Sequence, residues 1–146
     1  MIKWQKRIFR QNRSENPKIM NVILAISLGG IAGSLSRYYL SLLVQKHSGS
    51  FFPYGTLAVN IAGCLFIGFT MQFFIMRPAV SGAVKLFLVT GFAGAFTTFS
   101  TFGHETITLF LADNFKSAFL NIFASNFFGI LAVLAGSAAA RILMSL

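Results

Sequence analysis

The sequence predicts an all-α integral membrane protein with four transmembrane helices. Apolar residues make up 55% of the 146-residue chain and charged residues only 10%. The mean hydropathy is +0.73, outside the usual balance of soluble domains of this length. Four long stretches carry almost no charge, and each has the roughly 20 apolar residues that a helix needs to cross about 30 Å of hydrocarbon. The short connections leave no room for a separate soluble domain.

The chain begins with a basic tail, residues 1–18, which holds six of the twelve Lys and Arg residues. The whole chain has only three acidic residues and a formal net charge of +9. A basic segment beside a hydrophobic one is typical of a cytoplasmic flank that faces anionic lipid. We therefore expect a mobile tail, contact with membrane lipid and no nucleic-acid partner. The expected location is the plasma membrane, or the inner membrane of a Gram-negative organism.

The first predicted helix covers residues 19–44 and is interrupted only by Arg37. The basic tail and the apolar segment after it resemble a signal peptide. The apolar segment is longer than the core of a signal peptide, however, so we predict a helix that is retained in the protein. Met20 leaves an alternative start open. Gly29 and Gly33, and likewise Gly30 and Ser34, are small residues four apart, as on faces where helices approach closely. A cation within a span lies at the membrane interface or faces a partner or a water-filled cavity, and both roles for Arg37 stay open.

The second predicted helix covers residues 55–76, and Asn60 is its most polar interior residue. An amide in hydrocarbon needs hydrogen-bond partners. Taken alone, this segment leaves two roles open for Asn60, a bond between helices or a contact with a ligand.

The third predicted helix covers residues 82–111 and contains the most informative segment. Residues 91–102 read GFAGAFTTFSTF, with two glycines and four hydroxyl residues. We predict a break near its middle, at residues 94–98, which a membrane tolerates only where the freed carbonyls line a cavity or bind an ion. Such carbonyls suit a hard cation such as Na⁺.

Three phenylalanines in this segment, Phe96, Phe99 and Phe102, recur at every third position. A core or lipid-facing stripe is the usual explanation of such spacing. The edge of a Phe ring is electropositive, however, and rings presented edge-on stabilise a small anion without the tight binding of a full charge. Weak attraction of this kind suits conduction.

The fourth predicted helix covers residues 117–141, where Asn121, Ser125 and Gly129 are spaced by four. This stripe is explained either by helix packing or by a polar track beside a pore. No enzymatic constellation is present in the sequence: His104-Glu105 lacks the second histidine of a zinc-protease motif, and there is no nucleophile elbow or phosphate loop. We therefore expect no enzyme. Cys64 is the single cysteine, which excludes an intrachain disulfide.

With four spans, the N-terminus, the 77–85 connection and Arg141 lie on one side, and Lys46 and Lys116 lie on the other. Without the tail this is three basic residues against two, a near balance that allows insertion in both orientations. The six tail charges favour a cytoplasmic N-terminus. Whether the tail overrides dual insertion stays open.

Three strings together resemble the CrcB/Fluc fluoride channel family: residues 29–38, residues 55–68, and residues 91–102 followed by Glu105. The resemblance covers roughly residues 20–146, and TTFSTF at 97–102 is its most specific part. It implies an antiparallel dual-topology homodimer with two fluoride pores and a central structural Na⁺. The implied activity is passive fluoride efflux that lowers cytoplasmic fluoride.

The resemblance also implies roles for single residues. The backbone carbonyls of Gly94 and Thr97 would hold the Na⁺, and Phe99 and Phe102 would line the pores, one ring from each subunit. Asn60 would donate a hydrogen bond to fluoride or to the neighbouring rings. The remaining expected pathway residues are Thr98, Ser125, Arg37 toward the vestibule, and Glu105 one turn past the ring pair.

Helix 4 departs from the family pattern, because many relatives have tyrosine where this chain has Asn121 and serine where it has Gly129. The rim of the pore is therefore where this chain should differ. The main alternative function is a small multidrug-type proton-coupled transporter, which also uses four helices and dual topology. Such transporters need an acid in the first helix, and residues 19–44 contain none.

Overall fold

The computed structural model describes residues 19–145, and over this range the chain forms helices and short connections without a strand. The predicted basic tail lies outside the described residues. Four segments are long and apolar enough to cross a membrane: α2 (Ile19–Ser48), α3 (Tyr54–Met76), the composite span Gly82–Leu111 and α7 (Phe115–Ser145). The predicted all-helical class with four spans is confirmed.

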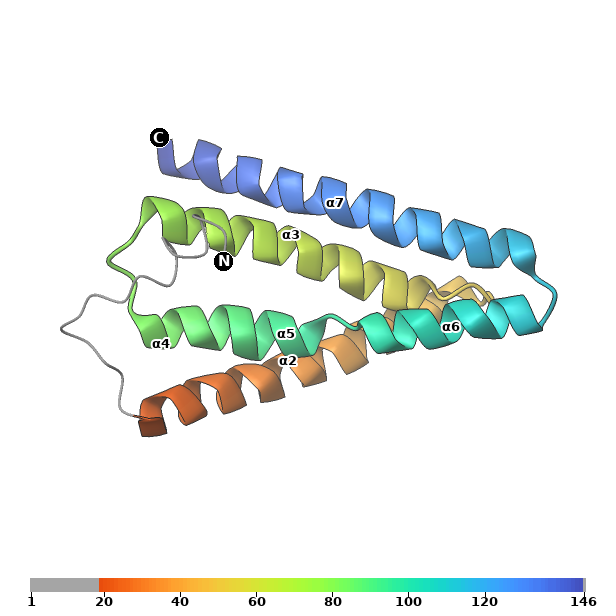
Figure 1. Cartoon of the computed structure of the whole chain (residues 1–146), viewed down its shortest axis with the longest axis horizontal. Coiled ribbons are helices and arrows are strands. Elements are labelled where there is room, and N and C mark those ends of the chain that lie inside the picture. Colours follow the sequence, from red (N-terminus) through yellow and green to blue (C-terminus); the bar gives the residue numbers. More distant parts are fainter. Residues whose placement is uncertain (1–18, 146) are drawn as a thin grey trace.

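The third span is built from several pieces. It comprises α4 (Gly82–Lys85), the π-helix η1 (Leu86–Ala93), α5 (Gly94–Phe96) and α6 (Phe99–Leu111). Between α5 and α6, Thr97 and Thr98 have extended backbone, with φ/ψ of −85°/156° and −146°/115°. Figure 1 shows this segment as a thin connection between the two helices.

Two spans are longer than the sequence predicts. Helix α2 continues beyond residue 44 to Ser48, and α7 begins before residue 117 and ends after residue 141. Hydrophobic length marks only the part that crosses hydrocarbon, whereas helical hydrogen bonding continues into polar ends. In α2 the last turn is supported by side chains, since His47 Nδ1 lies 2.9 Å from the Leu43 carbonyl and Ser48 Oγ donates to the Gln45 carbonyl.

Glycines bring the spans into close contact. Helix α3 packs chiefly against α7, and α2 packs chiefly against η1. A Cβ on Gly136 would collide with the Leu65 carbonyl, and a Cβ on Gly33 with the Phe92 carbonyl. These contacts place one backbone directly against another, as small-residue faces do in membranes.

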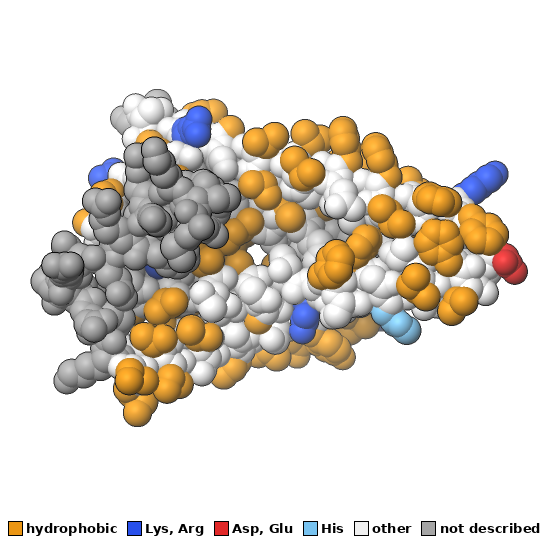
Figure 2. Space-filling model, viewed as in Figure 1, with side chains coloured by type: hydrophobic (Ala, Val, Ile, Leu, Met, Phe, Trp, Pro, Cys, Tyr) orange, Lys and Arg blue, Asp and Glu red, His pale blue; other side chains and the backbone are white. Residues whose placement is uncertain are grey.

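The outer surface is strongly apolar. Large side chains on α2 and α7 are exposed, including Leu28 at 58% and Leu134 at 61%, and Figure 2 shows apolar side chains spread over the helices in this view. Few large residues are fully buried, Phe74 and Val59 among them. A surface of this kind is stable against lipid or against a second protein surface.

The ends of the spans separate into two groups. Figure 1 places the beginning of α2, the end of α3, the beginning of α4 and the end of α7 at one end of the bundle. The α2–α3 and α6–α7 connections lie at the other end. The basic residues of the 77–85 connection and those of the other two connections are therefore on opposite sides of the apolar zone, as the sequence predicts.

Candidate functional site

The segment between α5 and α6 is held by one side chain of α3. Thr98 N–H donates to Asn60 Oδ1 at 2.8 Å, and Asn60 Nδ2 donates to the Thr98 carbonyl at 3.0 Å. The amide of Asn60 therefore satisfies both backbone polar groups of Thr98, which have left the helix. Such satisfaction is required within an apolar layer.

Several carbonyls lose their helical partners at this point, and those of Gly94 and Thr97 are among them. In a continuous α-helix Thr98 N–H would donate to the Gly94 carbonyl, but it donates to Asn60 instead. Thr101 N–H would donate to the Thr97 carbonyl, but it donates to Thr98 Oγ1 at 3.2 Å, which caps α6. The carbonyls of Gly94 and Thr97 are thereby released from the helix.

A pocket of about 400 Å³ lies beside this segment. We call it the interruption pocket; its lining comprises Asn60, Gly63, Cys64, Ile67, Val89, Ala93, Gly94, Thr97, Thr98 and Phe99. It brings together the two expected cation ligands and three expected pathway residues. Gly94 is exposed and Thr97 half-buried, so the released carbonyls lie near the surface of the subunit.

The phenylalanine stripe divides into two parts. Phe96 is 7% exposed and stacks on Phe92, with ring centroids 5.5 Å apart, so it belongs to the core. Phe99 is 83% exposed and Phe102 half-buried, and their ring centroids are 5.5 Å apart with planes tilted by 47°. An exposed aromatic ring beside a pocket is available to a second molecule or an ion.

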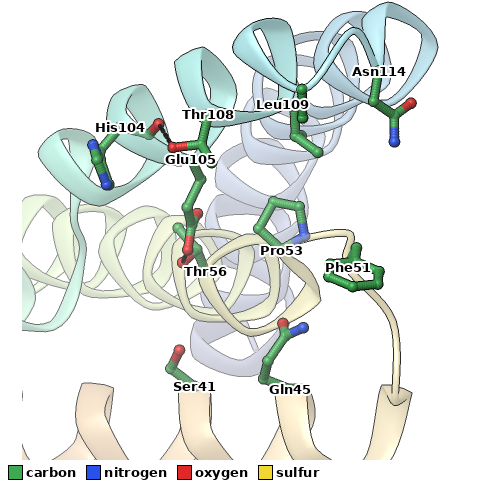
Figure 3. Close-up of a pocket in the computed structure, with 11 residues that line it drawn as sticks. Ser41, Gln45, Phe51, Pro53, Thr56, His104, Glu105, Thr108, Leu109 and Asn114 are labelled. Carbon is green, nitrogen blue, oxygen red and sulfur yellow. Dashed lines mark hydrogen bonds between the residues drawn. The ribbon is translucent and has the colours of Figure 1, made fainter.

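Glu105 lies in a second pocket, of about 490 Å³, toward the α2–α3 connection (Figure 3). Thr56 Oγ1 donates to Glu105 Oε1 at 2.8 Å. The other carboxylate oxygen, Oε2, is buried, and it has no hydrogen-bond partner among the described residues. The Glu105 pocket is lined by Ser41, Gln45, Phe51, Pro53, Thr56, His104, Glu105, Thr108, Leu109, Ala112 and Asn114.

The wall of the Glu105 pocket is held in place by Gln45, a residue that no pattern in the sequence singles out. Gln45 Nε2 donates to the carbonyls of Ser50 and Phe52, at 2.7 and 3.1 Å. Gly55 N–H donates to Gln45 Oε1 at 3.0 Å. One side chain thus ties the end of α2 to the beginning of α3.

The other expected pathway residues lie outside these two linings. Arg37 is half-buried on α2, one helical turn before Ser41 of the Glu105 pocket. Ser125 on α7 has a buried hydroxyl without a hydrogen-bond partner within residues 19–145. Phe102 lines neither pocket. One subunit therefore gathers five of the nine expected residues at the interruption pocket, places Glu105 alone in the other pocket, and leaves three outside both linings.

Asn121 is a core residue at only 1% exposure. Its Nδ2 donates to Thr106 Oγ1 at 2.9 Å, and Thr106 Oγ1 donates to the Phe102 carbonyl at 2.7 Å. Of the two explanations that the sequence leaves open for the stripe, helix packing and a polar track, the buried contact with α6 supports helix packing for Asn121.

The groups that could bind a cation at the interruption are backbone carbonyl oxygens. Within the part of the chain that the structure describes, no group of three or more His, Cys, Asp or Glu side chains is placed to hold a metal ion. The released carbonyls of Gly94 and Thr97 are hard oxygen donors, which suit an alkali cation.

Comparison with known proteins gives consistent matches. The profile of a family described as "CrcB-like protein, Camphor Resistance (CrcB)" matches residues 24–137. A protein of Dehalococcoides mccartyi is 44% identical over 81% of this chain and 91% of its own length. Proteins of Synechococcus sp. and Clostridium perfringens are 41% and 43% identical, over 84% and 82% of this chain and 95% and 94% of their own lengths. All three relatives bear the name "Fluoride-specific ion channel FluC".

Proposed function

The chain belongs to the CrcB-like family, and from this premise we propose that it is a fluoride-selective ion channel that lowers cytoplasmic fluoride by passive efflux. One observation carries the proposal: relatives named fluoride-specific ion channels are 41% to 44% identical over more than nine tenths of their length. Four apolar spans, together with relatives named ion channels, support a multi-pass protein of the plasma membrane.

Fluoride is small and strongly hydrated, so a selective path must replace its water with other donors while staying too narrow for chloride. Asn60 supplies an amide, Thr98 and Ser125 supply hydroxyls, and the rings of Phe99 and Phe102 supply electropositive edges. Arg37 attracts anions toward the vestibule, and Glu105 lies beyond the ring pair. The exposed ring of Phe99 and the unpartnered hydroxyl of Ser125 within residues 19–145 support these roles.

The working unit that we propose is an antiparallel dual-topology homodimer with two pores. The separation of the site residues supports it, because one subunit does not bring all of them to one pocket and a second subunit can complete the path. In each pore one ring comes from each subunit, Phe99 from one and Phe102 from the other. The exposed apolar surface of α2 and α7 offers area both for a partner and for lipid.

A Na⁺ ion at the centre of the dimer would be held by the interrupted third span. The donors fit, because the Gly94 and Thr97 carbonyls have lost their helical partners and Gly94 is exposed. Two carbonyls from each subunit would give an oxygen cage suited to a hard cation. The ion would bridge the two subunits and fix the position of the break.

Efflux needs no energy source in this mechanism. Weakly acidic HF enters a cell, dissociates at the higher internal pH, and leaves fluoride trapped as an anion. A channel then lets fluoride move down its electrochemical gradient. The alternative, a multidrug-type proton-coupled transporter, is not favoured because α2 contains no acidic residue.

The test is fluoride efflux from liposomes that contain the purified protein, followed with a fluoride electrode. We expect rapid fluoride release and negligible chloride release under the same gradient. Empty liposomes and chloride-loaded liposomes serve as controls. A well-folded preparation that releases no fluoride would overturn the proposal.

A further inference from the structure

We propose that Asn60 is a positioning residue that creates the cation site, by holding the Thr98 backbone out of the third helix. The inference rests on the proposed function and explains, in addition, why the Gly94 carbonyl is free. It concerns a contact between residues 38 positions apart in the sequence, which no local pattern in the sequence reveals.

The first step is the geometry of the clamp. The side-chain amide of Asn60 has one acceptor and one donor group at the separation found in a peptide group, and both are used on a single residue. Oδ1 accepts from Thr98 N–H at 2.8 Å, and Nδ2 donates to the Thr98 carbonyl at 3.0 Å. Asn60 thus supplies the hydrogen-bond partners that the Thr98 N–H and carbonyl would otherwise find in regular secondary structure.

The second step is the close packing of α3 against the interruption, which brings the Asn60 amide within reach of Thr98. Gly63 lies one turn after Asn60 on α3, and a Cβ at this position would collide with Cγ2 of Thr97. The missing side chain lets α3 approach the interruption closely. Val59, beside Asn60, is fully buried and anchors this part of α3 in the core.

The third step is the consequence for the carbonyls. As long as Thr98 N–H is bonded to Asn60, it is not available to the Gly94 carbonyl, the acceptor that a continuous helix would give it. Without the amide, Thr98 N–H would be an unsatisfied donor in an apolar layer, and rejoining the Gly94 carbonyl is its nearest remedy. The amide therefore keeps one of the two cation ligands free.

This role differs from direct contact with fluoride. A side-chain amide has two N–H groups, and one of them is committed to Thr98. The remaining N–H is compatible with a contact to an anion, so the two roles predict different losses when Asn60 is changed. A positioning role affects Na⁺ binding, whereas a fluoride contact alone affects only flux.

The experiment compares Asn60→Leu, Asn60→Asp and Thr70→Val in the purified full-length protein. Leu removes both bonds to Thr98, and Asp keeps the acceptor for Thr98 N–H but loses the donor. Thr70→Val is the matched control, a polar-to-apolar change at another buried position of α3. The primary measurement is the Na⁺ concentration that gives half of the maximal stabilisation against thermal unfolding, and fluoride efflux is measured in parallel.

We expect Asn60→Leu to raise the half-saturating Na⁺ concentration by about tenfold or more, about 1.4 kcal/mol of binding free energy, because the substitution removes the Gly94 carbonyl of both subunits from the cation site. Asn60→Asp should keep Na⁺ binding at the wild-type level or tighter, because the Gly94 carbonyl stays free and a negative charge is added. The same variant should lose fluoride flux through repulsion of the anion. Thr70→Val should behave like the wild type in both measurements.

Several results would overturn the inference. An unchanged Na⁺ dependence in Asn60→Leu, with flux lost, would assign Asn60 to fluoride contact alone. If Asn60→Leu does not fold, weakened Na⁺ binding in folded Asn60→Asp would equally contradict the clamp. A wild-type protein that conducts fluoride without any Na⁺ stabilisation would remove the cation site and this inference together. A wild-type protein that binds Na⁺ but conducts no fluoride would instead contradict only the proposed function.

Discussion

At the scale of single residues, a chain of hydrogen bonds supports the ring that we place in the pore. Asn121 of α7 donates to Thr106 of α6, and Thr106 donates to the carbonyl of Phe102. All three groups lie on or against α6, whose beginning is capped by Thr98 Oγ1. The backbone that carries the Phe102 ring is therefore supported by the cap on one side and by the contact with α7 on the other.

The first prediction concerns the ring pair. Phe99→Ile and Phe102→Ile should each slow fluoride efflux by about tenfold or more, an increase of about 1.4 kcal/mol in the barrier, because an aliphatic side chain has no electropositive edge. Dimer formation should be preserved. Phe123→Ile, an exposed phenylalanine on α7, is the control and should conduct normally. Wild-type flux in both variants would remove the ring pair from the mechanism.

The second prediction concerns the buried amide of α7. Asn121→Leu should lower the free energy of unfolding by about 1 kcal/mol, because a bond between helices is lost within a buried contact. The same substitution at exposed Asn126, whose side chain donates to the Ile122 carbonyl of its own helix, should have a smaller effect. Unfolding of the purified protein by denaturant in mixed micelles measures both. Equal losses would indicate that the Asn121–Thr106 bond contributes nothing specific.

Composition predicted which segments carry the candidate site but not how they meet. Residues 91–102 were predicted to belong to the site because their glycines and hydroxyl residues are unusual in an apolar segment. Asn60 was predicted for a similar reason, because an amide is unusual there. Their pairing depends on how α3 packs against the third span, which no local pattern specifies. Gln45 was missed for a related reason: its three bonds go to a connection whose course only the folded chain defines.

At the scale of helices, glycine positions decide which spans touch. In α2, Gly33 lies against the Phe92 carbonyl, whereas a Cβ added at Gly30 would meet no atom of the described residues within 4 Å. Spacing in the sequence predicts two close-packing pairs, Gly29 with Gly33 and Gly30 with Ser34. The structure confirms the first pair, which lies against η1, but not the second, because a Cβ at Gly30 would meet open space among the described residues. The π-helix itself, Leu86–Ala93, has no such signal, because its sequence is a continuous apolar run.

The third prediction uses these two glycines of α2. Gly33→Ala should lower the free energy of unfolding by about 1–3 kcal/mol, because the new methyl group forces two backbones apart. Gly30→Ala should be neutral or slightly stabilising, because alanine favours the helix by up to about 1 kcal/mol. Denaturant titration of both variants gives the comparison. Similar behaviour of the two would mean that α2 and η1 are not held at backbone contact.

At the scale of the whole molecule, the distribution of positive charge conflicts with a simple antiparallel homodimer. Outside the tail, three basic residues lie at one end of the bundle and two at the other, with Arg37 between them. This near balance allows a chain to insert in both orientations. The tail adds six charges to one end, which favours a single orientation with the N-terminus in the cytoplasm.

The fourth prediction therefore concerns the tail. With Cys64→Ala and a new C-terminal cysteine, an impermeant thiol reagent should label the full chain mainly from the cytoplasmic side. A chain that starts at Met20, and a full-length chain with the six tail Lys and Arg residues changed to Gln, should both be labelled from both sides, because only a near balance of charge remains. The second variant separates charge from tail length. Labelling of all three from one side would exclude the tail as the determinant, and an antiparallel dimer would then need an opposite-facing partner chain.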